Sequence, residues 1–279
     1  MSLVIGSVYA DAVNSKLGTA LKMKDIATDY TDMVSDILIY GNEVHFPTFD
    51  RLTSADEVTK GTALVPDEVG MSDNVATVKQ TGKAVRIYDK DKAQIKGAVV
   101  DNMAIQTAEV MAQKIDSDLV NEMIGNAVFK TATTNATPTV LEIEAGFDVF
   151  GDQVQNASFA GIVAHGKFRS ALMKMDEFTK IDKTYAVAGN GIVDNNNCIG
   201  FWNGTIPVYL SDQMVDVQNG NEPVMAIVKK GALGYVMQKE TSVEEEREAK
   251  LLATDLVSSN LYAVKLLDSK GVSLLKATV

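Results

Sequence analysis

The feature that most constrains this chain is a long stretch of helical periodicity over residues 89–130. Its apolar residues recur at multiples of four positions, and others widen the same stripe, which is typical of an amphipathic helix. The stretch has no proline, so we expect a nearly continuous helix of about 30 or more residues, reaching roughly 45 Å. The apolar row is Ile95, Val99, Met103, Met111, Ile115, Leu119 and Met123, and it is widened by Val100, Ala104, Ala108, Val110, Val120 and Ile124.

The opposite face of this helix is polar and is expected to lie in water. A row spaced by four residues drifts about 40° around a helix at each step, because four residues turn through about 400°. A strict coiled-coil seam does not drift in this way. The pattern therefore favours a strut that supports an extended domain over a coiled coil. The polar face consists of Lys96, Asp101, Asn102, Gln106, Glu109, Gln113, Lys114, Asp116, Asp118 and Glu122.

Composition bounds the class of protein. With 279 residues and 46% apolar content, the chain can bury a real core in one large domain or two small ones. Lys and Arg total 26 against 37 Asp and Glu, which gives a net charge of −11 without a basic cluster. Tight binding of nucleic acid through its phosphates is therefore disfavoured. The same acidity suits a wall that confines DNA without adhering to it.

Other chemical frameworks are also excluded by the sequence. Cys198 is the single cysteine, so there is no intrachain disulfide framework, and a thiolate metal site is implausible. The first residues have neither the basic nor the apolar region of a signal peptide, and nowhere do about 18 apolar residues run together. We expect a protein that is neither conventionally secreted nor membrane-spanning.

Two segments before the long helix are expected to reach outward. Residues 8–23 have the spacing of an amphipathic helix, with too little to bury against itself, so it must pack on the body or on a neighbouring chain. Residues 43–47 and 75–88 have strand patterns, separated by turn and charged residues. Two extended arms with a polar tip between them predict a long projecting hairpin over residues 43–88, which is suited to touching a partner.

The remainder of the chain predicts an α+β fold, with helices early and in the middle. Helical spacing covers residues 143–155 and the segment after His165, and residues 160–164 have the pattern of a buried strand. An Asn-Gly pair predicts a hairpin turn within residues 199–212. Residues 131–139 and 189–197 are loop-like, and residues 244–250 fit either a strand or a loop. Short apolar runs predict further strands at 224–228, 233–237, 241–246, 251–257, 261–267 and 272–275.

Few residues carry catalytic chemistry. His45 and His165 are the only histidines, and neither lies near a nucleophile motif, so a structural role is favoured for both. Cys198 is interpreted as a small core residue and not as a nucleophile. Residues 231–234 lack the lysine and hydroxyl of a phosphate loop, and they are predicted to form a turn.

Two acidic stretches are candidate cation sites. The run Asp89-Lys90-Asp91 resembles the start of a calcium loop, but the next residues break that pattern, so a cap at a helix entry is the better interpretation. Residues 244–248 are acidic enough for a divalent cation, although a solvated or intersubunit charge strip is favoured. We assign no catalytic, cofactor-binding or metal-binding residue, and an assembly subunit is favoured over an enzyme.

The order of these motifs resembles the major capsid (coat) proteins of tailed bacteriophages, whose fold is shared with encapsulins. Each motif is weak alone, and their order and spacing over nearly the whole chain carry the resemblance. The segments concerned are residues 43–47, 77–88 running into 91–93, 114–118 on the long helix, 161–167, 199–200 with 204–208, and 228–232 followed by 244–247.

The resemblance implies a phage major capsid protein fold in four parts. These are an N-terminal arm over residues 1–42, an extended β-hairpin loop over 43–88, a peripheral domain with a long spine helix over 89–144 and 259–279, and an axial domain over 145–258. It also implies self-assembly into hexamers and pentamers of an icosahedral phage head around double-stranded DNA. The alternatives are an encapsulin-like nanocompartment that holds a cargo enzyme and, from another class, a metal-dependent enzyme that uses the acidic strip.

The resemblance further implies partners and a location. The partners are other copies of the chain, a portal, a decoration protein and a separate scaffolding protein, because the chain starts directly in the arm. The virion capsid is the expected location, after assembly in the host cytoplasm, with no membrane and no cofactor. Some family members cross-link a loop lysine, and Lys60 lies in the corresponding region. No asparagine partner is identified, so cross-linking is not predicted.

Overall fold

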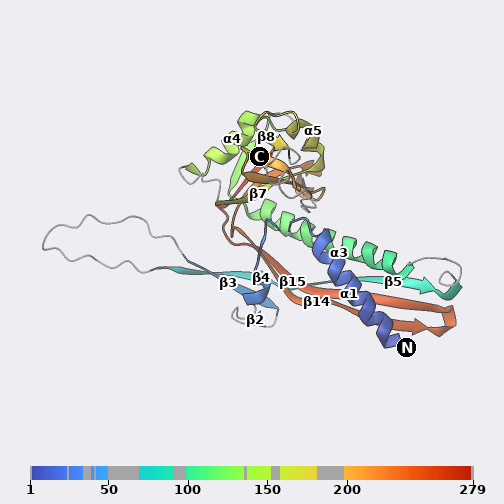
Figure 1. The fold of residues 1–279 in the computed structure, drawn as a ribbon. Helices are drawn as coiled ribbons and strands as arrows, with labels where there is room; N and C mark the ends of the chain where they lie inside the picture. The colour runs from blue at the N-terminus through green and yellow to red at the C-terminus, as the bar shows by residue number, and fades with distance from the viewer. Residues whose placement is uncertain are drawn as a thin grey trace.

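A long, narrow sheet carries the longest helix in the computed structural model, which describes residues 2–23, 25–33, 39–40, 42–49, 69–90, 99–134, 137–151, 158–180 and 198–277 (Figure 1). The four strands of this sheet lie in the order β1 (Thr28–Asp29), β14 (Leu233–Glu248), β15 (Ala253–Leu266) and β5 (Lys79–Tyr88). β14 and β15 are long antiparallel neighbours, and β5 extends this pattern on the far side of β15. The sheet is therefore a ribbon with one broad face available for helices.

Helices α1 (Ser2–Ala20) and α3 (Val99–Asn126) pack against each other and against this sheet (Figure 1). The 28 residues of α3 reach about 42 Å at about 1.5 Å per residue, so the predicted strut is confirmed. The helix ends at Asn126 and not at residue 130. Residues 89–90, where its start was predicted, are helical, and residues 91–98 lie outside the described ones. The predicted apolar stripe is buried at Ala104, Ala108, Met111, Ile115, Leu119, Val120, Met123 and Ile124, whereas Val110, which was predicted in it, is 46% exposed.

The predicted polar face of α3 was wrong at two positions. Asp116 and Asp118 were expected in water, but they are only 2% and 5% exposed. The cause is a second packing partner, because α1 and the chain that follows it cover one flank of α3 while β15 covers another. Periodicity alone assigns one buried stripe to a helix, whereas a helix held between two partners buries a wider surface.

The first helix packs on the body of its own chain. Tyr9, Val13 and Leu17 are at most 3% exposed and belong to the same core as α3 and the long sheet. Of the two interpretations that the sequence left open for this segment, the structure therefore gives the first.

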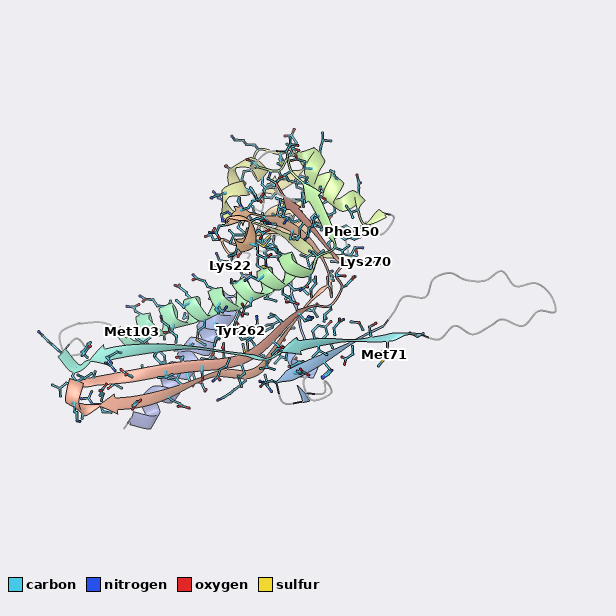
Figure 2. All side chains as sticks on the ribbon, turned by 180° about the vertical axis from the view of Figure 1, so that it is seen from behind. Lys22, Met71, Met103, Phe150, Tyr262 and Lys270 are labelled. Atoms are coloured by element: carbon cyan, nitrogen blue, oxygen red, sulfur yellow. The ribbon has the colours of Figure 1, made fainter. Side chains whose placement is uncertain are left out.

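The predicted hairpin is present, and it projects to one side of the molecule (Figures 1 and 2). β3 (Glu43–Phe49) pairs with β4 (Met71–Thr77) in antiparallel register, and β2 (Ile39–Tyr40) adds a third strand. Val44, Phe46 and Ala76 pack on Val236 and Ala263 of the long sheet. The predicted polar tip, with Lys60, lies outside the described residues.

A compact lobe with a seven-stranded sheet sits at one end of α3 (Figure 1). Two short helices, α4 (Val140–Asp148) and α5 (Arg169–Leu172), belong to it, and the N-terminus of α4 has a capping box between Thr139 and Glu142. A two-stranded pair, β11 (Val215–Asp216) and β12 (Glu222–Pro223), lies in the same part of the chain. The sheet order is β6 (Phe129–Ala132), β16 (Val272–Lys276), β13 (Met225–Lys229), β7 (Phe159–Ala164), β10 (Ile206–Leu210), β9 (Cys198–Trp202) and β8 (Phe178–Lys180).

Short 3₁₀ helices connect several of these elements. Gly166–Phe168 leads from His165 into α5, as the turn into a helix predicted there. Asn203 and Gly204 both have positive φ angles, 47° and 72°, which fits the predicted Asn-Gly turn between β9 and β10. The other 3₁₀ helices among the described residues are Thr31–Met33, Val217–Asn219 and Ala249–Leu251.

Several predicted boundaries differ from the structure. Residues 233–237 and 241–246 form one strand, β14, interrupted only by two register shifts between Met237 and Ser242. The undecided residues 244–250 are strand as far as Glu248. The predicted helix over 143–155 is the shorter α4, and the predicted loop over 131–139 begins with the last residues of β6.

The two large sheets also divide the chain differently from the expected domain boundaries. β14 was expected in the axial domain, but it lies in the long sheet with β5 and under α3. β16 was expected in the peripheral domain, but it pairs with β6 and β13 in the compact lobe. The chain thus passes between the two parts more often than a division into continuous segments allows.

The first prediction concerns the core under α3. Ile115 is fully buried, so Ile115→Asp places an unpaired carboxylate in an apolar site and is expected to cost more than about 4 kcal/mol of folding free energy. Val110→Asp is the matched control, because Val110 is on the same helix and 46% exposed. Denaturant unfolding and soluble yield measure both variants. Soluble Ile115→Asp protein with the stability of Val110→Asp would contradict the assignment of this core.

Candidate functional site

The two histidines occupy local structural positions. His45 on β3 lies with its Nδ1 atom 2.6 Å from Asp73 on the neighbouring strand β4. His165 follows β7, and its Nδ1 accepts a hydrogen bond from the backbone N–H of Lys167, which caps the turn into α5. Burial lowers the pKa of His165, against the field of Asp212. Each ring therefore organises its own strand or turn.

The other chemical candidates are likewise built into the scaffold. Cys198 is buried, and burial raises the pKa of its thiol, which disfavours the thiolate that a nucleophile or metal ligand requires. Gly231 has a φ of 78° and lies in the predicted turn ahead of β14. Within the described ranges, no group of three or more His, Cys, Asp or Glu side chains is arranged to hold a metal ion.

The acidic stretches are partly neutralised within the chain. Arg247 forms a two-pronged ion pair with Asp89, at 2.5 and 2.9 Å, which joins Asp89 to β14. Arg86 on β5 binds Asp255 on β15 and also Glu248 on β14. These contacts cross the long sheet near its far end, and they hold its three long strands together through side chains.

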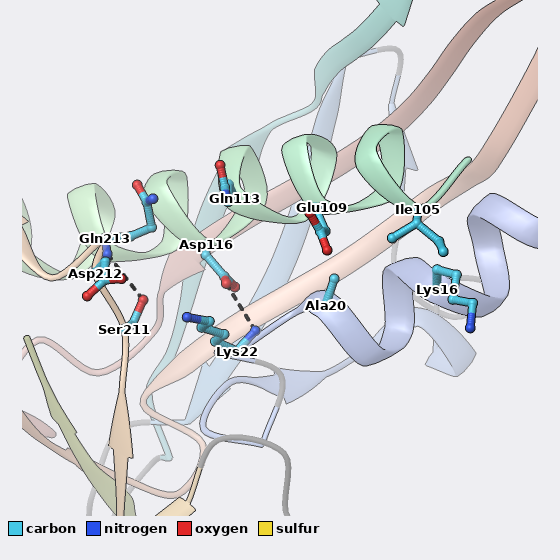
Figure 3. A pocket seen from close by; sticks show the side chains of 10 residues that line it. All are labelled: Lys16, Ala20, Lys22, Ile105, Glu109, Gln113, Asp116, Ser211, Asp212 and Gln213. Carbon is cyan, nitrogen blue, oxygen red and sulfur yellow. Dashed lines mark hydrogen bonds between the residues drawn. The ribbon is translucent and has the colours of Figure 1, made fainter. Parts of the chain in front are cut away.

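A group of polar contacts anchors the N-terminal helix α1 to α3. The buried carboxylate of Asp116 accepts a hydrogen bond from the backbone N–H of Lys22, at 3.0 Å (Figure 3). It accepts another from the backbone N–H of Met23, at 3.2 Å. Farther along α1, the hydroxyl of Tyr9 lies 3.0 Å from that of Thr107. The backbone N–H groups directly after the end of α1 are therefore hydrogen-bonded to a side chain of a different helix, α3.

A second polar contact joins α1 to β14. The side-chain amide of Asn14 donates to the carbonyl of Thr241 and accepts from its backbone N–H, both at 3.2 Å. Thr241 lies within the register shift of β14 and has no partner in the β14–β15 register. An asparagine supplies both a donor and an acceptor, so it satisfies the two backbone groups that the irregularity leaves over.

Asp118 forms the contact between α3 and the middle of the long sheet. It accepts hydrogen bonds from the Tyr262 hydroxyl, at 2.7 Å, and from Lys114, at 2.9 Å. Lys79 of β5 lies 3.4 Å away. Burial acts to raise the pKa of Asp118, but these hydrogen bonds and lysine charges outweigh it and lower that pKa. The carboxylate is therefore ionised and fully partnered.

A cavity of about 460 Å³ lies beside the Asp116 anchor, where α1, α3 and the turn after β10 meet (Figure 3). Among the residues that line it, lysines and carboxylates are mixed and there is neither a histidine nor a cysteine. The cavity is thus a polar junction between the helices and the compact lobe. Its lining consists of Lys16, Ala20, Lys22, Ile105, Glu109, Gln113, Asp116, Ser211, Asp212 and Gln213.

The outer face of the projecting hairpin exposes apolar side chains. Val69, Met71 and Val75 are 56%, 67% and 38% exposed, while the alternate residue Ala76 points inward and is buried. An apolar surface on a projecting element is a feature of contact with a partner. None of the described helices is long and apolar enough to cross a membrane.

Comparisons with known proteins agree with an assembly role. A family model described as phage capsid protein matches residues 72–274, from β4 to β16, which is well over half of the chain. No curated protein matches the chain. The matched span includes the long sheet, α3 and the compact lobe.

Solved capsid structures have the same fold. A structure from Mycobacterium phage Che8 has 16% identity and a TM-score of 0.59, covering 91% of this chain and 90% of that chain. The capsid of cyanophage P-SCSP1u has 14% identity and a TM-score of 0.63, covering 91% and 87%. The capsid of a native GTA particle has 10% identity and a TM-score of 0.63, covering 93% and 91%. At these identities the likeness shows the fold, and it gives no support to the encapsulin-like alternative.

The second prediction concerns pH and the arm anchor. Burial raises the pKa of Asp116 from 3.8 to about 6, against the two N–H groups that bind it. The folded state therefore holds this proton more tightly than the unfolded state, so the Asp116 contribution to stability is full below about pH 4 and falls by about 3 kcal/mol as the pH rises to about 6.

Asp116→Asn removes this titration and is the matched variant. Denaturant unfolding of both proteins at intervals from about pH 4 to about pH 7 gives the difference in stability, which cancels the other titrating groups. We expect the wild type to lose stability relative to Asp116→Asn across this range. A difference that is constant with pH would contradict the assigned environment of Asp116.

Proposed function

Because the chain belongs to the phage capsid protein family and is a major capsid protein of a phage head shell, we propose that its copies associate as hexamers and pentamers of an icosahedral shell around double-stranded DNA. The observation that carries this proposal is the projecting hairpin, whose inner face packs on its own subunit and whose outer face leaves Val69, Met71 and Val75 uncovered. A second copy of the chain is the partner that a shell supplies to every subunit.

The proposal assigns a role to each part of the fold. Residues 1–42 form the arm, of which α1 and the chain directly after it are docked on the body, and the hairpin of β3 and β4 is the extended loop. The long sheet with α3 is the peripheral domain, and the seven-stranded lobe is the axial domain. The role is structural and not enzymatic. The polar contacts support it, because Asp116, Asn14 and Asp118 join elements of the subunit to one another.

The interior of the shell confines DNA without a specific site for it. The net charge of −11 supports this part of the proposal, because an acidic wall repels phosphates and leaves the packaged DNA free of tight contacts. The proposed partners beyond other copies are a scaffolding protein, a portal and a decoration protein, and assembly takes place in the host cytoplasm before the protein resides in the virion.

The third prediction tests assembly directly. The purified protein, alone and together with the proposed scaffolding protein, is expected to form shells or ring-shaped capsomers in electron microscopy. Analytical ultracentrifugation measures the assembled fraction. A compact monomer under all of these conditions would overturn the proposal. Particles that enclose a cargo protein and take up no DNA would replace it with the nanocompartment.

The fourth prediction tests the outer face of the hairpin. Met71 is 67% exposed, so Met71→Asp is expected to change the unfolding free energy by less than about 0.5 kcal/mol and to lower the yield of shells by about tenfold or more. Met71→Leu keeps an apolar side chain and is expected to assemble normally. Denaturant unfolding and shell yield are measured for both. Wild-type yield with Met71→Asp would exclude this face from the assembly contacts.

A further inference from the structure

The four-stranded sheet has two edges that pair with no further described strand over most of their length (Figure 1). β5 forms one edge, and β14 forms the other, because the short β1 pairs only with Gly234 and Tyr235. The side chain of Asn14 hydrogen-bonds to the backbone carbonyl and N–H of Thr241. Beyond that point, residues 242–248 pair only with β15 among the strands of the described part of the chain. Each edge therefore presents backbone groups to a neighbour.

These two edges carry opposite charge. β5 has three basic side chains, Lys79, Lys83 and Arg86, and no acidic one. Residues 242–248 of β14 have four glutamates and one arginine, a net of three negative charges. Charge of one sign on each edge prevents indiscriminate pairing and at the same time selects a partner of the other sign.

Part of this charge is not used inside the subunit. Lys79, Arg86, Arg247 and Glu248 form ion pairs within the chain. Lys83, Glu244 and Glu246 are exposed, and they make no hydrogen bond or ion pair with any residue that the structure describes. Glu244 and Glu246 are two positions apart on the same face, so each raises the energy of the other. Both edges thus keep uncompensated charge on the surface.

We propose that the β5 edge of one copy docks beside residues 242–248 of β14 in the next copy. Two identical edges repel, whereas the basic and acidic edges attract, so the contact joins two different surfaces of the same chain. Such a heterologous contact continues from copy to copy and closes into a ring when the rotation between copies allows it. This inference rests on the proposed function and deepens it, because it names the surface by which subunits meet within a ring.

Lys83 and Glu244 are the side chains that test this contact. Reversing either of them breaks no ion pair within the described residues, so the fold of the subunit is preserved. Lys83 lies on the same face as Ile87, and Glu244 lies on the other face, opposite Val257 in the register with β15. The two reversals therefore test the net charge of each edge, and they do not test a single ion pair between Lys83 and Glu244. Lys270 is exposed, lies away from both edges, and provides a charge-matched control (Figure 2).

The experiment compares five full-length proteins by sedimentation velocity at about 50 mM salt, where surface charges are weakly screened. These are the wild type, Lys83→Glu, Glu244→Lys, the double variant and Lys270→Glu. We expect each single edge reversal to weaken capsomer association by about tenfold, the double variant to weaken it further than either single reversal because it lowers the charge of both edges, and Lys270→Glu to have no effect. Raising the salt to about 0.5 M is expected to weaken the wild-type association.

The outcomes separate this inference from the proposed function. Wild-type rings whose association is unchanged by the single reversals, or is no weaker in the double variant than in the single variants, would overturn the edge contact and leave the shell function in place. A wild-type chain that stays monomeric in every condition would overturn the shell function and the edge contact with it.

Discussion

The structure depends on the burial of α3 from two sides. One flank of this helix packs on the long sheet, and the other packs on α1 and the chain that follows it. A helix with two partners must bury polar positions as well as apolar ones, and a buried carboxylate is stable only where donors meet it. Asp116 meets two backbone N–H groups from the end of α1, and Asp118 meets Tyr262 and Lys114. These contacts set the position of α3 over the sheet and of α1 beside it.

Sequence periodicity predicts the local elements well and their partners less well. The strut, the hairpin and the Asn-Gly turn follow from patterns of a few residues, and all are present. The burial of Asp116 depends on the chain after α1, 94 positions earlier at Lys22, and that of Asp118 on Tyr262 of β15, 144 positions later, so no window along α3 contains that information. The type of residue offered no clue either, because charged side chains on a helix face normally lie in water.

For a similar reason, the sequence predicts two short strands where the structure has the single long strand β14. Two register shifts between Met237 and Ser242 interrupt the alternating pattern of β14, and glutamates follow them, so the sequence has the pattern of a strand, a break and a loop. In the structure, Asn14 supplies the missing hydrogen bonds and β15 continues the pairing on the other side. Sequence patterns also do not predict that β14 lies in the long sheet and β16 in the compact lobe, because strand order depends on pairing between distant segments.

The docking of α1 narrows the surfaces that are left for assembly. Three of its side chains, Tyr9, Val13 and Leu17, are nearly completely buried, and burial of each apolar side chain of this size contributes about 1.5–3 kcal/mol. A helix held in this way belongs to the subunit core, and releasing it to reach a neighbour would expose the flank of α3 that it covers. Contacts between copies are therefore better supplied by surfaces that are already exposed in the folded subunit. The outer face of the hairpin and the two charged edges of the long sheet meet that condition, and they lie on elements that the buried α3 and its sheet hold rigidly.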